Sequence, residues 1–125
     1  MILDTNAISA LAGKDPDLIR KLRDTRRVAV TLINLGEYKF GIAHSREKAE
    51  LTNWLNSFLS RADVLCPDVE TSDYYADVRT ELKKAGTPIP ANDCWIAAIT
   101  RQHGMPILSR DQHFDLVDGI HRIEW

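Results

Sequence analysis

The stretch MILDTN, residues 1–6, opens the chain and indicates its fold. Three apolar residues form a minimal buried strand, and Asp4 follows where that strand ends. Ile8 and Leu11 come next at helical spacing. An ionised carboxylate away from water is strongly disfavoured, so Asp4 requires something that compensates its charge. Chemistry this close to the first strand predicts that this strand lies at the centre of a sheet.

The rest of the chain repeats this alternation of short apolar runs and helical patterns. Further strands are predicted at residues 28–31, 63–66, 106–108 and 120–125. Helical patterns cover residues 16–22, a segment from about residue 34, and residues 51–58, 75–85 and 92–104. Strands joined through helices form parallel sheets that are covered on both faces. The pattern therefore predicts a three-layer α/β sandwich around a mainly parallel sheet of about four or five short strands.

The bulk properties indicate one ordinary domain. No linker, repeat or low-complexity segment divides the chain, so residues 1–125 are predicted to form a single domain. The composition, 44% hydrophobic and 27% charged, is typical of a soluble globular protein. No apolar run approaches the roughly 18 residues that cross a bilayer, and no secretory pattern opens the chain. We therefore expect a cytoplasmic protein without a membrane partner. Cys66 and Cys94 show neither a disulfide nor a zinc pattern.

Four acids fall where an apolar run stops and a helix or turn begins: Asp4, Glu37, Asp93 and Asp111. Each has a simple structural explanation, because three of them can cap helices, and Asn34 followed by Glu37 resembles a capping box. Capping does not require the four to meet, however. In open parallel sheets the functional crevice lies beyond the carboxyl ends of the strands. Convergence of the four acids at that edge is therefore the discriminating prediction.

Several carboxylates in one cleft repel each other unless a cation lies between them. Oxygen ligands select Mg²⁺ or Mn²⁺ over zinc, and such ions serve phosphoryl transfer. The net charge of −2 argues weakly against a nucleic-acid partner. Neutralisation of the four acids by bound ions would reverse the sign of that charge, so the whole-chain value does not decide the matter.

Four motifs carry a family resemblance: ILDTN at residues 2–6, NLGE at 34–37, NDCWIAA at 92–98 and LSRDQHF at 108–114. In this order and at this chain length they resemble the motifs of PIN-domain ribonucleases, and most of all the VapC-type toxins of bacterial toxin–antitoxin pairs. The resemblance implies a PIN-like sandwich and a metal-dependent endoribonuclease. Its one or two Mg²⁺ or Mn²⁺ ions would be held by the four acids, with RNA products that carry 5′-phosphate and 3′-hydroxyl ends. A cognate antitoxin protein and homodimerisation are also implied.

Neighbouring polar residues are candidates for supporting roles. Thr5, Asn6 and Ser109 either donate hydrogen bonds to metal ligands and their waters or serve as cap and turn residues. Asp115 is either a fifth acid at the rim of the site or a solvated loop residue. Arg110 either meets a substrate phosphate or forms a surface pair. The four histidines do not form a ligand pattern, and the position of His113 is interpreted as structural.

Two alternatives to a nuclease stay open at the level of sequence. The first is another Mg²⁺-dependent phosphoryl-transfer enzyme, such as a haloacid-dehalogenase-like phosphatase. That class needs a second acid two residues after Asp4, where this chain has Asn6. The second alternative is a non-catalytic α/β interaction domain whose acids only cap helices. Fold alone does not separate these classes, since common folds host many functions.

Overall fold

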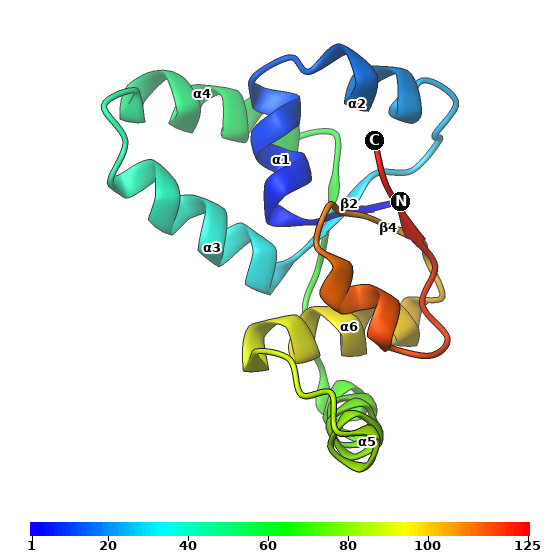
Figure 1. The fold of residues 1–125 in the computed structure, drawn as a ribbon. Helices are drawn as coiled ribbons and strands as arrows, with labels where there is room; N and C mark the ends of the chain where they lie inside the picture. The colour runs from blue at the N-terminus through cyan, green and yellow to red at the C-terminus, as the bar shows by residue number, and fades with distance from the viewer.

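A parallel five-stranded sheet lies between two layers of helices in the computed structural model, which describes residues 1–125 (Figure 1). The strand order is β3-β2-β1-β4-β5, and every neighbouring pair is parallel. The strands are Ile2–Leu3 (β1), Ala29–Thr31 (β2), Asp63–Leu65 (β3), Ile107–Leu108 (β4) and Arg122–Ile123 (β5). The predicted α/β class and the central place of β1 are therefore confirmed.

Six α-helices and one short 3-10 helix connect the strands. They are Thr5–Ala12 (α1), Pro16–Leu22 (α2), Leu32–Ala43 (α3), Lys48–Leu59 (α4), Val69–Ala85 (α5), Ala91–His103 (α6) and Gln112–Leu116 (η1). The α3 helix begins earlier than predicted, because the side chain of Thr31 caps it by accepting from the backbone N–H of Asn34. The capping box that Asn34 and Glu37 resemble in sequence, the structural alternative for Glu37, is therefore not formed. Asp93 is not a cap either, since Pro90 is the N-cap residue of α6.

The two faces of the sheet are covered by different helices. Consecutive strand residues point to opposite faces, so fully buried Ile2 packs in the cluster that contains residues of α5, α6 and η1. Leu3, also fully buried, packs in the cluster that contains residues of α1, α2, α3 and α4. Each such burial contributes about 1.5–3 kcal/mol. Burial on both faces therefore compensates for the shortness of β1.

Backbone hydrogen bonds tie β1 to both of its neighbours. The N–H of Ile2 donates to the carbonyl of Pro106 at 2.8 Å, and the N–H of Ala29 donates to the carbonyl of Met1 at 2.9 Å. Beyond the strand, the N–H of Asp4 donates to the carbonyl of Leu108 at 3.1 Å. The backbone of Asp4 is thus anchored to β4 before its side chain makes any contact.

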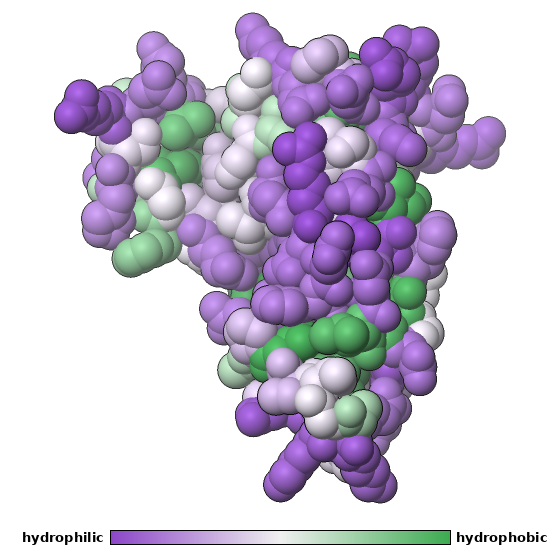
Figure 2. Space-filling model, viewed as in Figure 1, coloured by the Kyte–Doolittle hydropathy of each residue, from purple (hydrophilic) through white to green (hydrophobic).

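The surface shown in Figure 2 is mostly hydrophilic, with apolar areas over α3 and α4 and over the α5 and α6 region. Two large apolar side chains of α3 are well exposed, Leu32 at 46% and Phe40 at 70%. None of the helices combines the length and the apolar character that a membrane crossing requires.

Candidate metal centre

Asp4 is held by four hydrogen-bond donors at the point where β1 ends. Its Oδ1 accepts from the backbone N–H of Thr5 at 2.9 Å and from Nδ2 of Asn34 at 2.8 Å. Its Oδ2 accepts from the hydroxyl of Ser109 at 2.5 Å and from Nδ2 of Asn6 at 3.2 Å. Only 6% of Asp4 is exposed, and burial raises its pKa while these donors oppose the rise. The carboxylate therefore has a fixed orientation.

Asn34 is fully buried between Asp4 and the end of β2. The hydroxyl of Thr31 donates to Oδ1 of Asn34 at 2.7 Å, so the amide nitrogen must face away from Thr31. That nitrogen donates to Asp4 and also to the hydroxyl of Thr5, at 3.1 Å. The sequence indicates Asn34 only as a helix-start residue, and it does not reveal the hydrogen bond from Asn34 to Asp4. The usable signal was its place in the NLGE motif, one helical turn before Glu37.

Ser109 connects Asp4 to Asp111. Its fully buried hydroxyl donates to Asp4 and accepts from the backbone N–H of Asp111 at 2.9 Å. The backbone N–H of Arg110 donates to Oδ1 of Asn6 at 3.3 Å. The loop after β4 is therefore joined by hydrogen bonds to the loop after β1. Thr5, Asn6 and Ser109 therefore each donate a hydrogen bond to the Asp4 carboxylate, Thr5 through its backbone N–H and the other two through their side chains.

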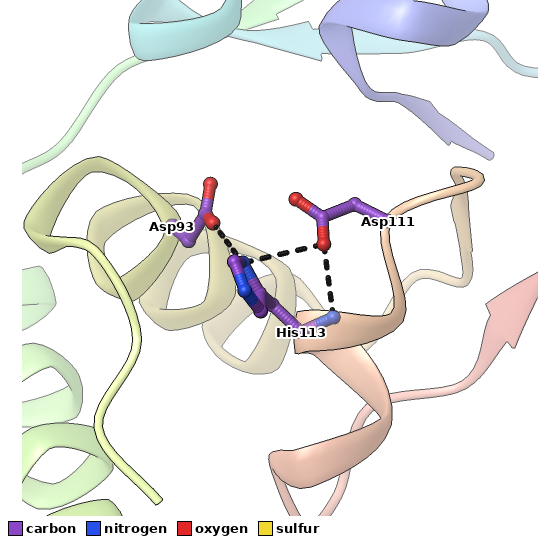
Figure 3. A group of neighbouring side chains, drawn as sticks. All are labelled: Asp93, Asp111 and His113. Carbon is purple, nitrogen blue, oxygen red and sulfur yellow. Dashed lines mark hydrogen bonds and ion pairs between the residues drawn. The ribbon is translucent and has the colours of Figure 1, made fainter.

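Asp93, Asp111 and His113 form a second cluster beside this network (Figure 3). Asp111 is the N-cap of η1, and its Oδ1 accepts from the backbone N–H of His113 at 2.9 Å. Nδ1 of His113 lies 2.8 Å from Oδ2 of Asp93 and 3.3 Å from Oδ1 of Asp111. One atom from each of the three side chains lies within 4.8 Å of the others. His113, whose position is interpreted as structural from sequence, thus turns its imidazole toward two of the predicted site acids.

Glu37 projects from the second turn of α3 without a donor for one of its oxygens. Its Oε1 is buried and has no hydrogen-bond partner. Burial raises the pKa of Glu37, and the charges of Asp4, Asp93 and Asp111 raise it further. The charges of all three other acids thus act on Glu37. The structure brings the four predicted acids together at one edge of the sheet.

The titration of Asp93 and His113 reflects the same crowding. Burial raises the pKa of Asp93, the hydrogen bond with His113 lowers it, and the charges of Asp111 and Asp4 raise it. The hydrogen bond to Asp93 raises the pKa of His113, and both aspartate charges add to that rise. A positive charge is therefore favoured at this position, whether it is carried by the imidazole or by a metal ion.

The donor set fits a divalent cation. Four carboxylates offer hard oxygen ligands, which suit Mg²⁺ or Mn²⁺. The buried, unpartnered Oε1 of Glu37 costs free energy unless a cation or a donor approaches it. A bound ion would remove both this penalty and the mutual repulsion that raises the pKa of Glu37 and of Asp93.

Two weaker candidates have other partners. Both carboxylate oxygens of Asp115 accept from Arg122 at 2.8 Å. The guanidinium of Arg110 lies over the ring of Trp125, 4.3 Å from its centroid, and 3.8 Å from Oδ2 of Asp15. The structure does not bring either side chain into the hydrogen bonds of the acid cluster.

Comparison with protein families and curated sequences yields consistent matches. A family model described as PIN domain matches residues 1–120, a range that includes all four clustered acids. Ribonuclease VapC2 of Rickettsia felis is 32% identical over 101 residues, which cover 78% of this chain and 75% of that protein. The tRNA(fMet)-specific endonuclease VapC of Salmonella typhimurium is 27% identical over 127 residues, with 99% and 96% covered.

Solved structures with the same fold include toxin–antitoxin complexes. DNA-bound VapBC from Salmonella typhimurium superposes with a TM-score of 0.88 at 26% identity, covering 99% of this chain and 96% of that one. VapBC2 from Rickettsia felis, bound to a DNA fragment from its promoter, gives a TM-score of 0.87 at 26% identity, covering 99% and 97%. The similarity therefore extends over the entire sheet and both helical layers.

Proposed function

The chain belongs to the PIN-domain family and, within it, to the VapC ribonucleases, and from this premise we propose that its four clustered acids hold the ions that cleave RNA. Membership makes the chain a hydrolase, an endoribonuclease of the toxin class in type II toxin–antitoxin systems. PIN-domain nucleases generally use divalent metal ions, and an acidic cluster is present. The phosphatase-like and non-catalytic alternatives lose support accordingly.

The observation that supports the proposal is a buried oxygen of Glu37 that has no donor and that the charges of the other three acids reach. Asp4 alone is explained by its donors, and Asp111 alone by its cap. Glu37 has neither a donor at Oε1 nor a capping role, and the charges of the other three acids raise its pKa. One or two Mg²⁺ or Mn²⁺ ions at this point would satisfy all four groups.

The residues of the chain would orient the reaction rather than attack the substrate. Bound divalent ions lower the pKa of a coordinated water and stabilise charge that develops at phosphorus. Asp4 is held in one orientation by its four donors, so the geometry of its oxygens is set before any ion binds. The backbone of Asp111 is held by Ser109, whose hydroxyl accepts from the Asp111 N–H. No serine or cysteine nucleophile is required by this arrangement.

Two grooves meet at Glu37 and provide space for a single strand of RNA. One, of about 400 Å³, lies among α1, α3 and α4, and the other, of about 590 Å³, lies between α3 and the start of α6. Thr5 and Glu37 line both grooves. We propose that the scissile phosphate sits at this junction and that the flanking nucleotides occupy the two grooves. Groove shape would then set the choice of RNA.

An antitoxin and a second copy of the chain are the protein partners that we propose. The antitoxin is supported by the structural neighbours, which are VapBC toxin–antitoxin complexes. For the homodimer, the support is the exposure of two large apolar side chains eight residues apart on α3, Leu32 and Phe40. Replacing Phe40 with serine is expected to shift the oligomeric state toward monomer in light scattering, whereas an unchanged mass would remove α3 from the interface.

An RNA cleavage assay tests the nuclease proposal directly. Wild type and Asp93→Asn would be compared on a panel of tRNAs, because two relatives are named tRNA(fMet)-specific endonucleases. Mg²⁺, Mn²⁺ and chelator are the three conditions, and Asp17→Asn on the exposed face of α2 is the matched control. Cleavage is expected only with metal and only when Asp93 is intact. Chelator-resistant cleavage, or full activity of Asp93→Asn, would overturn the proposal.

A further inference from the structure

We propose that Nδ1 of His113 is a ligand of the metal centre and that it makes the centre a mixed nitrogen and oxygen site that prefers Mn²⁺ to Mg²⁺. The inference rests on the proposed function, because it concerns the same centre. It adds a ligand that lies outside the four acids and a choice between the two candidate ions.

The distances around His113 match those between neighbouring ligands of one ion. In an octahedral site with bonds of about 2.1 Å, adjacent ligand atoms lie about 3 Å apart. Nδ1 of His113 is 2.8 Å from an oxygen of Asp93 and 3.3 Å from an oxygen of Asp111. Figure 3 shows the imidazole and the two carboxylates pointing toward one another from η1, α6 and the loop after β4.

Local structure, rather than chance exposure, directs the imidazole to this place. The backbone N–H of His113 donates to the side chain of Asp111, and this bond fixes the start of η1. Phe114, the next residue, is fully buried in the core and anchors the same turn. The His113 side chain itself is 46% exposed, so close packing does not explain its direction. Its contacts with the two acids do.

The chemistry of an imidazole ligand carries the metal preference. Imidazole nitrogen binds transition ions well, whereas Mg²⁺ favours carboxylate and water oxygen. Three or four carboxylates alone would not separate Mg²⁺ from Mn²⁺ strongly. One nitrogen among them shifts the balance toward Mn²⁺. His113 can act as a ligand through Nδ1 in its neutral form while the other ring nitrogen carries the proton.

The competing possibility is that His113 is only a counter-ion, and it predicts the opposite sign of change. A protonated imidazole between two carboxylates competes with a metal for the same negative charge. Its removal would then strengthen the binding of both ions. If His113 is a ligand, its removal weakens the binding of Mn²⁺ and has less effect on Mg²⁺. The direction of the change separates the two roles.

Calorimetric titration of the full chain with Mn²⁺ and with Mg²⁺ measures that direction. His113→Gln is expected to weaken Mn²⁺ binding about tenfold and Mg²⁺ binding less than about twofold. The matched control is His121→Gln, an exposed histidine outside the cluster, which is expected to change neither value. Equal or tighter Mn²⁺ binding by His113→Gln would overturn the inference.

A spectroscopic measurement on the wild-type chain gives a second readout that does not depend on a variant folding well. Pulsed electron paramagnetic resonance of bound Mn²⁺ is expected to show coupling to one ¹⁴N nucleus, and the coupling should disappear in His113→Gln. Metal-dependent RNA cleavage without nitrogen coupling would overturn the inference and leave the proposed function intact. Absence of any divalent binding by the wild type would overturn both.

Discussion

Asp4 and Glu37 face the same centre, but the protein supports them in opposite ways. Asp4, at the end of a strand, accepts four hydrogen bonds from the chain. Glu37, on a helix, is buried at Oε1 with no donor. The site thus has two halves. In the strand-end half, Asp4 and Ser109 are held in place by hydrogen bonds without an ion. In the helix half, Glu37 and Asp93 repel each other until an ion binds between them.

The difference has a geometric origin. Strand ends bring several loops together, so backbone and side-chain donors such as Ser109 reach Asp4 easily. Glu37 lies in the second turn of α3, where the backbone N–H groups are used within the helix, so it has no backbone donor. Asp93, in the first turn of α6, has Nδ1 of His113 as its close partner instead. We infer that the strand-end half orients the centre and that the helix half supplies most of the demand for a cation.

The largest effect is expected from Asp4→Asn, which breaks the strand-end half. The new amide would turn its NH₂ group toward one side of the site, where either Ser109 and Asn6 or Thr5 and Asn34 donate, so both donors on that side lose their acceptor. We expect a loss of about 1–3 kcal/mol in the free energy of unfolding without metal. RNA cleavage should fall by about 100-fold or more. Urea denaturation and initial cleavage rates measure the two effects.

The exposed Asp17→Asn is the control for Asp4→Asn: it loses one surface ion pair with Arg20, so it should leave cleavage unchanged and lower the free energy of unfolding by no more than about 0.5 kcal/mol. A metal-free Asp4→Asn chain with wild-type stability would mean that the four donors do not stabilise the carboxylate. The proposed difference between the two halves would then be lost.

Ser109→Ala is expected to have a smaller effect in the same direction. It removes one donor from Asp4 and one acceptor from the backbone of Asp111. The free energy of unfolding should fall by about 1 kcal/mol, and the cleavage rate by about tenfold. Ser72→Ala, whose hydroxyl bonds only to a backbone carbonyl on α5, is the matched control. Equal behaviour of the two variants in both assays would contradict a specific role for Ser109.

Much of this arrangement was predictable because its signals are local. Short apolar runs predicted the strands, and their positions predicted that Asp4 and Asp111 each follow a strand; that the two strands are neighbours is seen only in the structure. The predicted sheet is confirmed, and it proves entirely parallel. That the four acids bind metal remains a prediction. The burial of Asp4 and its four hydrogen-bond donors were not predicted, because a strand of only two residues gives little reason to expect them.

The missed residues act through contacts that sequence patterns do not encode. Asn34 reaches Asp4 across 30 positions, and His113 reaches Asp93 across 20. The same limit applies to candidates that the structure directs elsewhere. Asp115 binds Arg122, and neither a turn signal nor a charge pattern distinguishes that pairing from a place in the cluster. Residues at element boundaries are visible in sequence, whereas their partners depend on how the boundaries meet.

The pH dependence of stability reports on both halves of the site together, because both contain groups with raised pKa values. The pKa values of Asp4, Glu37 and Asp93 are raised above 3.8, 4.5 and 3.8, and that of His113 above 6.5. Between the unfolded and folded pKa values the native state binds more protons, so stability falls as pH rises through that window. We expect a metal-free melting temperature that declines as pH rises above about 4, because of the three acids, and declines further above about 6.5, where His113 contributes.

A divalent ion should reduce that decline, because it binds the deprotonated groups and stabilises the native state more as pH rises. Scanning calorimetry with and without Mn²⁺ measures the effect. Acids with lowered pKa, such as Asp15, Asp68 and Asp115, lose their contribution only as pH falls below about 4, so they do not affect this window. A decline that Mn²⁺ leaves unchanged would place its cause outside the centre.

The smallest effect on stability, and the one of opposite sign, is expected from Glu37→Gln. The substitution removes a charge that burial and three neighbouring acids disfavour, so the metal-free chain should become more stable. Because the side chain is partly exposed, the gain should be no more than about 0.5 kcal/mol after solvent screening. The stabilisation that Mn²⁺ provides should shrink at the same time, and RNA cleavage should be lost.

The two expected changes, a higher metal-free stability and a smaller stabilisation by Mn²⁺, distinguish Glu37 from Asp4 most clearly. A structural carboxylate gives lower stability on amidation with or without metal, as expected for Asp4. A carboxylate that is kept for a cation gives higher stability without the ion and a smaller response to it. Glu50→Gln, on the exposed face of α4, controls for the change of side chain. If Glu37→Gln loses stability without metal, a donor must reach Oε1 in solution, and the two halves of the site are supported alike.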